Sequence, residues 1–332
     1  GLAPGPGSAR ALDAVLEPAH EAGSVHREGE DWVFWHDRIR EAAYLSLAAG
    51  ERPGLHLQIV RRQLANQGMH QGAPSQRFTL AVQASLARPA VDAPEERRAF
   101  ARLNLEAGRQ AKAATAHHSA LGFFRAALAF LGEDDASEDG LHARALCGEA
   151  EFMTGALELA EACLAALEQV AGEGVFGADL TRLRAALYTT LGRFDRALDV
   201  GLAFLRKAGI ELPRQPDAAA VDREHAALQA WIERHGMAAF RQLPIVADPL
   251  RRAITDIFAD LIPPALYTDQ NLVDLILLHM ARLGIAHGHA DASADGYVCM
   301  TQVFGVRYGD YATAREFGAL ALHLVDERGL AR

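Results

Sequence analysis

The sequence predicts an all-α protein assembled from short helices that pack in pairs. Apolar residues recur three and four positions apart over long stretches, as in Leu183, Leu187 and Leu191. Runs with a period of two are nearly absent, and the one plausible strand is "DWVFW" at residues 31–35. Glycine, proline and acidic clusters interrupt the helical pattern at intervals that suit helical hairpins. These interruptions lie at 132–140, 172–177, 209–217, 262–271 and 287–296.

The first part of the chain predicts a helix, a turn, a strand and a second helix. The segment 8–31 has the pattern of a helix followed by a turn, and it leads into the strand at "WVFW". Asp37 is expected to be the N-cap of the next helix, because a carboxylate there accepts hydrogen bonds from free backbone N–H groups. Helix, turn, strand and helix form the closing half of a winged-helix unit.

Three later segments share one pattern: a glycine, a bulky residue two positions on, and an alanine three positions further. The triplets are Gly155, Leu157 and Ala160; Gly192, Phe194 and Ala197; and Gly309, Tyr311 and Ala314. An earlier segment keeps the alanine, Ala120, but has Thr115 at the glycine position. Glycine permits a tight turn between two helices, the bulky residue is expected to wedge between them, and alanine lets them approach closely.

The spacing of these alanines predicts further copies. Ala120, Ala160, Ala197 and Ala314 lie 40, 37 and 117 residues apart, and 117 is three times 39. Two degenerate units therefore fit between Ala197 and Ala314. The pattern resembles tetratricopeptide repeats of about 37 to 40 residues, longer than the usual roughly 34. That resemblance implies an α-α superhelix whose concave face holds a protein or small-molecule ligand; the alternative is an irregular helical bundle.

Composition limits the chemistry that these residues support. A formal charge of -10 and a pI near 5.8 argue against a nucleic-acid-binding surface. The only lysines are Lys112 and Lys207, and neither follows the glycine-rich turn of a P-loop or lies in a protein-kinase motif. We therefore predict no catalytic site, bound cofactor or metal within this segment, and leave open whether the parent protein is an enzyme.

Cysteine usage and hydropathy bear on location. The three cysteines, at 147, 163 and 299, are far apart and form no zinc or disulfide pattern, which fits a reducing cytoplasm. The longest apolar run, 272–285, is interrupted by Asp274, His279 and Arg282, so no membrane span is expected. The sequence opens with "GLAPGPGSAR" in place of an initiating methionine, and we expect it to be a piece of a longer chain.

The segments "FWHDRIREAAYLSL" (34–47) and "ERPGLHLQIVRRQL" (51–64) resemble a particular family. They are similar to the region after the ATPase core in large bacterial signalling proteins, which fuse a serine/threonine-kinase-like domain, a STAND-type AAA ATPase, helical repeats, and often a GAF domain and a sensor histidine kinase. The resemblance implies that residues 1–70 end a winged-helix/ATPase arm and that 71–332 are the helical repeats. It also implies that the partners are the protein's own ATPase and kinase domains, and that ATP, ADP and magnesium bind to the parent ATPase.

His36 has three competing interpretations. A phosphoacceptor histidine is also followed by an acid and an arginine, but the usual proline is missing from "HDR". In related STAND switches, a similar His-Asp pair lets histidine contact the β-phosphate of ADP, which makes His36 a candidate nucleotide sensor. In the third interpretation His36 is structural, and lies satisfied between Trp35 and the helix cap.

Two further hypotheses stay open. His287, His289 and Asp291 in "HGHAD" are potential metal ligands, although the segment is more typical of a solvated loop between helices. The leading functional hypothesis is a non-catalytic sensing module that biases the ATPase and the attached kinase. The alternative is the ligand-sensing repeat region of a maltose-regulator-like transcription factor, whose output would be DNA binding.

Overall fold

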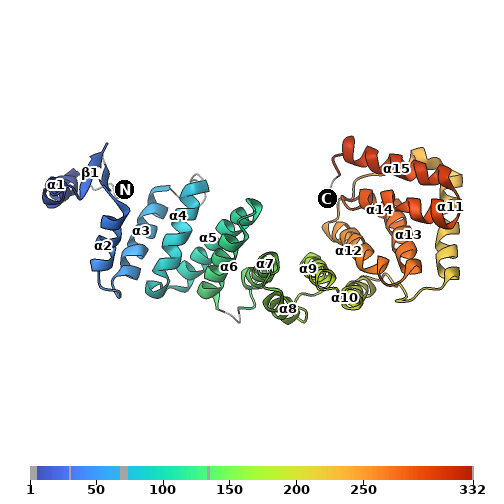
Figure 1. Ribbon diagram of the computed structural model, residues 1–332, viewed down its shortest axis with the longest axis horizontal. Helices are drawn as coiled ribbons and strands as arrows, with labels where there is room; N and C mark the ends of the chain where they lie inside the picture. Colours follow the sequence, from blue (N-terminus) through green and yellow to red (C-terminus); the bar gives the residue numbers. More distant parts are fainter. Residues whose placement is uncertain (1–5, 30, 68–73, 133–134, 331–332) are drawn as a thin grey trace. The chain divides into compact units, whose positions relative to one another are not determined.

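The computed structural model describes residues 6–29, 31–67, 74–132 and 135–330. Over these ranges the chain is all-α apart from one two-stranded hairpin, which confirms the predicted fold class. It divides into two compact units, Gly1–Ala143 and Arg144–Arg332 (Figure 1). The predicted domain boundary between residues 70 and 71 lies outside the described residues. No helix in the described ranges is both long and apolar enough to cross a membrane.

The first unit begins with a helix, an antiparallel hairpin and a second helix. These elements are α1 (Pro6–Glu21), β1 (Val25–Glu28), β2 (Asp31–Phe34) and α2 (Asp37–Ser46). Val25 lies opposite Phe34, and Glu28 lies opposite Asp31. The indole N–H of Trp32 donates to the Asp13 carboxylate at 3.0 Å, which fixes the hairpin to α1. Strand β1 was not predicted, because its segment "VHRE" is mostly polar and has no apolar alternation.

Helical hairpins form the rest of the first unit. They comprise α3 (Arg52–Gln67), α4 (Pro74–Ala87), the short 3₁₀ helix η1 (Arg88–Ala90), α5 (Pro94–Ala113), α6 (His117–Leu131) and the start of α7 (Glu138–Met153). Helices α5 and α6 approach most closely at Gly108, where a Cβ atom would lie 2.3 Å from the Phe124 ring. Thr115 turns the chain between these two helices with a φ of 58°.

A buried histidine joins three helices of this unit. The hydroxyl of Tyr44 on α2 lies 2.9 Å from Nε2 of His56 on α3, and Nδ1 of His56 lies 2.6 Å from the side-chain oxygen of Gln83 on α4. Because an amide oxygen only accepts, Nδ1 carries the proton and Nε2 accepts from Tyr44. This neutral imidazole attaches α2 to the first helical hairpin.

The second unit stacks further hairpins. Its elements are the end of α7, then α8 (Leu157–Ala166), α9 (Val175–Thr190), α10 (Phe194–Lys207), α11 (Ala218–Arg241), α12 (Pro249–Leu266), α13 (Gln270–His287), α14 (Ser293–Met300), the π-helical η2 (Thr301–Arg307) and α15 (Tyr311–Asp326). Four hairpins pair α7 with α8, α9 with α10, α12 with α13, and α14–η2 with α15. In three of the four turns, the motif glycine has a φ of 84° (Gly155), 69° (Gly192) or 72° (Gly309).

The region between Ala197 and Ala314 contains one hairpin, not the two predicted from the spacing. The α12–α13 pair packs between α9–α10 and α14–α15, as a repeat would. The remaining length forms α11, a long helix that lies against α13 and α15 and has no antiparallel mate (yellow in Figure 1). Gly236 interrupts α11 with a φ of 77°. An inserted helix therefore occupies the place assigned to a second repeat.

The proline pair of the predicted break at 262–271 does not end a helix. Pro263 and Pro264 lie inside the last turn of α12, which continues to Leu266. Proline removes a backbone donor and usually disrupts a helix interior. Here the two prolines lie in the final turn, so the helix continues for only two residues after them. The hydroxyl of Thr268 donates to the carbonyl oxygen of Pro264 at 3.2 Å.

The residues of the repeat motif differ in burial. The alanines Ala160, Ala197 and Ala314 are buried at the helix contacts. At the bulky position, Leu157 and Phe194 are half-buried, but Tyr311 is 71% exposed and lies over Gly305. The prediction that Tyr311 wedges between two helices is therefore wrong. It lies on α15, the last helix of the unit, with no further hairpin of the described chain packed over it.

Replacing Gly201 tests the close approach of α10 to α12. A Cβ atom at Gly201 would lie 2.5 Å from the δ-carbon of Leu261, which is fully buried. We expect Gly201→Ala to lower the free energy of unfolding by about 1–3 kcal/mol, since overpacking forces neighbouring side chains from their rotamers. Urea denaturation of the chain measures the effect.

Gly318 on α15 provides the control. A Cβ atom there meets nothing within 4 Å, so Gly318→Ala is expected to raise stability by roughly 0.5–1 kcal/mol through helix propensity. Equal effects of the two substitutions would contradict the close packing of α10 on α12.

Candidate functional site

A groove on the second unit is the candidate binding surface. The first helices of three successive hairpins, α9, α12 and α14, lie side by side, since α12 contacts both of the others. A cavity of about 460 Å³ follows the face that they share. Its walls combine small apolar, hydroxyl and acidic side chains: Ala186, Thr189, Thr190, Ala259, Asp260, Ile262, Pro263, Asp295 and Cys299. Concave sites with few polar groups in an apolar lining are typical of ligand recognition.

The charges at this groove are mainly negative. Arg182 on α9 lies 3.0 Å from the Asp256 carboxylate and 2.9 Å from the Asp260 carboxylate, both on α12. Asp260 and Asp295 both line the groove, and Asp295 is exposed. A cationic group entering the groove would meet carboxylate oxygens.

The cysteine of the groove is not activated. Burial raises the pKa of the Cys299 thiol, and the nearby Asp295 carboxylate raises it further. A thiol with a raised pKa stays protonated and is a poor nucleophile. In the ranges that the structure describes, no group of three His, Cys, Asp or Glu side chains is placed to hold a metal ion.

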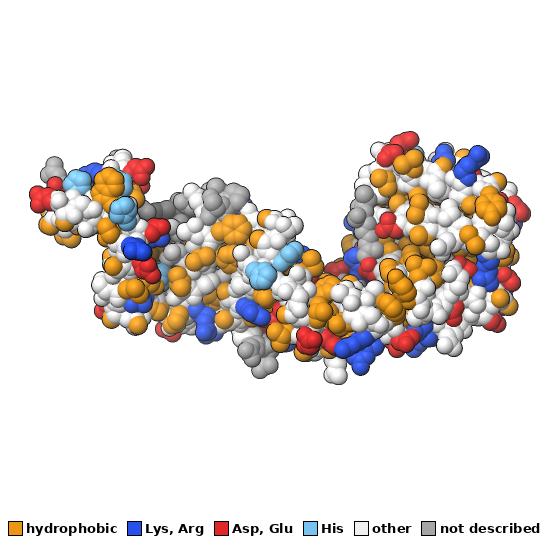
Figure 2. All heavy atoms as spheres, viewed as in Figure 1, with side chains coloured by type: hydrophobic (Ala, Val, Ile, Leu, Met, Phe, Trp, Pro, Cys, Tyr) orange, Lys and Arg blue, Asp and Glu red, His pale blue; other side chains and the backbone are white. Residues whose placement is uncertain are grey.

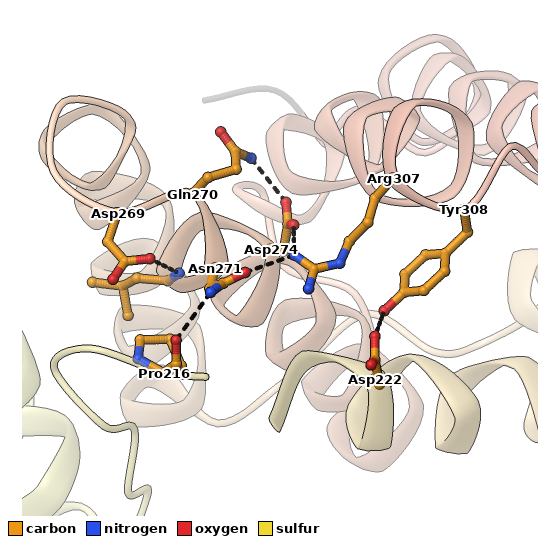
Figure 3. Close-up of polar contacts among 9 residues, drawn as sticks. Pro216, Asp222, Asp269, Gln270, Asn271, Asp274, Arg307 and Tyr308 are labelled. Atoms are coloured by element: carbon orange, nitrogen blue, oxygen red, sulfur yellow. Dashed lines mark hydrogen bonds and ion pairs between the residues drawn. The ribbon is translucent and has the colours of Figure 1, made fainter. Parts of the chain in front are cut away.

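A polar cluster beside η2 holds the inserted helix in place (Figure 3). Asp274 on α13 is only 2% exposed, and Arg307 donates to it and to the Asn271 side chain at 2.8 Å each. Gln270 donates to the second carboxylate oxygen of Asp274 at 2.9 Å. Asn271 in turn donates to the carbonyl of Pro216, just before α11, at 3.1 Å. Buried ion pairs need such additional hydrogen bonds to offset desolvation.

The residue that follows η2, Tyr308, continues the cluster onto α11. The Tyr308 hydroxyl donates to the Asp222 carboxylate at 2.5 Å, and its ring stacks on His225 with centroids 3.7 Å apart. Burial and the Asp222 contact raise the pKa of Tyr308 to about 12. The pKa of His225 is lowered, chiefly by burial. The end of the π-helical segment thus directs Arg307 toward α13 and the following Tyr308 toward α11. Such segments are frequent at functional sites.

His289 belongs to the core, which corrects the expectation of a solvated loop at 287–296. It is fully buried, Nε2 lies 2.9 Å from the carbonyl oxygen of Phe240, and Nδ1 lies 3.1 Å from the Tyr297 hydroxyl. Because the carbonyl only accepts, Nε2 carries the proton and Tyr297 donates to Nδ1. Backbone hydrogen bonds with Pro244 and Val246 pair this loop with the one after α11.

The structure places His36, not Asp37, at the N-cap of α2. The carbonyl of His36 accepts from the backbone N–H groups of Ile39 and Arg40, and its side chain makes no capping hydrogen bond. Asp37 is the first helical residue and pairs with Arg40 at 3.2 Å, so the prediction that it caps the helix is wrong by one position. Its negative charge still lies where the helix dipole favours it.

The side chain of His36 is exposed. Trp35 stacks on His26, with ring centroids 4.3 Å apart, and not on a buried His36. The structural interpretation expected His36 to pack against Trp35, and the ring of Trp35 lies against His26 instead. An exposed imidazole at the start of α2 is open to a ligand from outside the first unit, and whether that ligand is a nucleotide stays a hypothesis.

Comparison with known proteins gives one distant relation. The chain is similar to a hybrid signal transduction histidine kinase G of Dictyostelium discoideum, with 22% identity over 338 residues. The match covers 89% of this chain and 10% of that protein, so the chain spans about a tenth of its relative's length. No known protein-family profile matches the sequence. The chain thus resembles one region of a signalling protein.

Removing Arg307 tests the cluster beside η2. Arg307→Leu leaves Asp274 buried and without its cation, and breaking a buried pair in this way costs about 3 kcal/mol. Urea denaturation should show that loss, whereas Arg315→Leu on the exposed face of α15 should change stability by less than about 0.5 kcal/mol. Replacing Asp274 and Arg307 together by leucine is expected to restore part of the loss; a double variant no more stable than Arg307→Leu would contradict the pairing.

The buried His289 predicts a loss of stability in acid. Burial has the largest effect on the pKa of His289 and lowers it. The hydrogen bond to the Phe240 carbonyl raises this pKa, and the charges of Arg328 and His323 lower it. The unfolded chain binds a proton near pH 6.5, but the folded chain does so only at lower pH. This contribution is complete above about pH 6.5 and disappears as the pH falls through the folded pKa.

The measurement is the urea midpoint between about pH 5 and pH 7.5. His289→Gln should flatten the acid slope, because the titrating group is gone. The exposed neighbour His287 is the control, and His287→Gln should retain the slope of the natural protein. His225 and His279 also have lowered pKa values, chiefly from burial, so part of the slope should remain.

Proposed function

We propose that the chain is a non-catalytic sensing and protein-interaction module of a multidomain signal-transduction protein. The observation that carries the proposal is its similarity, over 89% of its length, to a tenth of a hybrid signal transduction histidine kinase. A segment of that relative size serves as one module among several. An array of helical hairpins with an open groove supports binding, because such arrays recognise partners on extended concave surfaces.

The groove over α9, α12 and α14 is the proposed binding surface. The carboxylates of Asp260 and Asp295 line it, which favours a partner segment that carries lysine or arginine. Small side chains such as Ala186 and Ala259 leave room for an apolar group beside the charge. On the face seen in Figure 2, acidic, basic and apolar side chains are interspersed over the second unit.

Output passes, in this proposal, to ATPase and kinase domains of the same protein in the cytoplasm. A ligand in the groove changes the balance between ADP-bound and ATP-bound states only if it binds the two states with different affinity. ATP, ADP and magnesium then belong to the parent ATPase, and the exposed His36 is a candidate contact for the nucleotide. The similarity to a histidine kinase favours this output over the DNA-binding output of a maltose-regulator-like protein.

Blocking the groove tests the proposal. Thr190 is exposed at the end of α9 and lines the groove, so Thr190→Trp fills it without disturbing the core. In the full-length protein we expect ATP turnover and autophosphorylation to change by on the order of five-fold or more, the usual range of coupling between sites. Ala203→Trp, at an exposed position on α10 outside the groove, should leave both activities unchanged.

Three outcomes would contradict the proposal. One is an equal effect of the two tryptophan variants, with circular dichroism showing that both fold. Another is full-length signalling that persists unchanged after the whole segment is deleted. The third is ATP turnover by this segment alone, because that would require a catalytic site within it.

A further inference from the structure

The second unit has another cavity, and its lining residues, at positions 238–328, differ from those of the groove. It measures about 610 Å³ and lies between the C-terminal end of α11 and the last helix, α15. Five of its six lining residues are polar or charged: Ala238, Arg241, Gln242, Glu316, His323 and Arg328. Two arginines and a histidine converge on one cavity in a chain whose formal charge is -10. The polar cluster of Figure 3 and the groove use none of these residues.

Arg241 has hydrogen-bonding capacity that the protein does not use. Its Nε atom is buried and has no hydrogen-bond partner. Its nearest carboxylate, Glu316, lies 3.7 Å from a terminal nitrogen, which is longer than a hydrogen bond. A buried donor without an acceptor costs free energy, so an acceptor supplied by a ligand would be stabilised there.

Arg328 is oriented by the end of α11. Its terminal nitrogens donate to the carbonyl oxygens of Arg241 and Leu243 at 3.4–3.5 Å. These long contacts use few of the five N–H donors of a guanidinium group. They hold Arg328 beside the cavity and leave donors for a second acceptor.

The electrostatic field near the cavity is positive. The charges of Arg328 and His323 lower the pKa of the buried His289, in addition to the larger effect of its burial. Glu316 and Glu327 oppose this field, and Glu327 lies 3.1 Å from His323 on the exposed side.

We propose that this cavity binds the oxyanion group of a small molecule, a phosphate or a carboxylate. Arg241 and Arg328 supply paired N–H donors, an arrangement that matches the oxygens of both groups. Gln242 and His323 complete the rim, and Glu316 competes with the ligand for Arg241. A bound oxyanion would join the part of α11 beyond Gly236 to α15. The site is independent of the proposed partner groove.

The test is isothermal titration of the full chain with inorganic phosphate and, separately, with citrate. Arg241→Gln removes a charge-assisted contact and should weaken binding roughly tenfold to a hundredfold. Glu316→Gln removes the competing carboxylate and should strengthen it. Arg234→Gln, at an exposed position on α11 outside the cavity, should bind as the natural protein does. A preference for phosphate over citrate identifies a phosphorylated ligand, and the reverse identifies a carboxylate.

Two results would overturn the proposal. The first is no binding of either anion to the natural protein. The second is weakening by Arg234→Gln equal to that by Arg241→Gln, which would indicate a non-specific response to total charge. Arg328 is not substituted, because it also supports the end of α11. The test therefore uses Arg241→Gln and Glu316→Gln, which are expected to change the affinity for the anion in opposite directions. Equal thermal melting of those two variants controls for folding.

Discussion

The structure depends on the close approach of helices that bury their apolar faces only against the neighbouring hairpin. Small residues set that approach: Gly201 leaves room for Leu261, Gly148 leaves room for Leu164, and Ala160 and Ala197 lie buried at the contacts. Left-handed residues make several of the turns tight, at Thr115, Gly155, Gly192 and Gly309. Since no hairpin has a complete core alone, stability is shared along each unit, as expected for repeat-like folds.

Where the array becomes irregular, polar contacts add to the apolar packing of Val221, Leu228 and Phe240 on α11. Helix α11 is held by hydrogen bonds from three side chains. Tyr308 donates to Asp222 on α11, Arg282 donates to Glu224 on α11, and Asn271 donates to the carbonyl of Pro216, just before α11. The buried pair of Asp274 and Arg307 lies at the centre of these contacts. Directional hydrogen bonds tolerate fewer alternative positions than apolar contacts do, so they specify where a single helix docks.

Local sequence predicted the helices well, because the period of apolar residues and the turn glycines act over a few positions. Gly155, Gly192 and Gly309 were recognisable for that reason. The predictions were wrong where contacts with other segments determine the structure. Strand β1 forms because β2 pairs with it. His289 is buried because Phe240, 49 residues away, supplies a hydrogen-bond acceptor. The sequence predicted a concave binding face but not the residues of the groove, because the alignment of α9, α12 and α14 depends on how the helices pack. The Arg241 cavity left no local signal, because its residues come from two helices.

The kink at Gly236 divides α11 into two parts with separate anchors. The first part is attached to η2 through Asp222 and His225, whereas the second ends at the carbonyls that Arg328 holds. A glycine with positive φ is a natural pivot, because no side chain restricts its rotation. Both anchors belong to the last hairpin, through Tyr308 before α15 and Arg328 after it. The proposed oxyanion cavity and the contacts of Asp222 and His225 thus lie on opposite sides of Gly236 along α11.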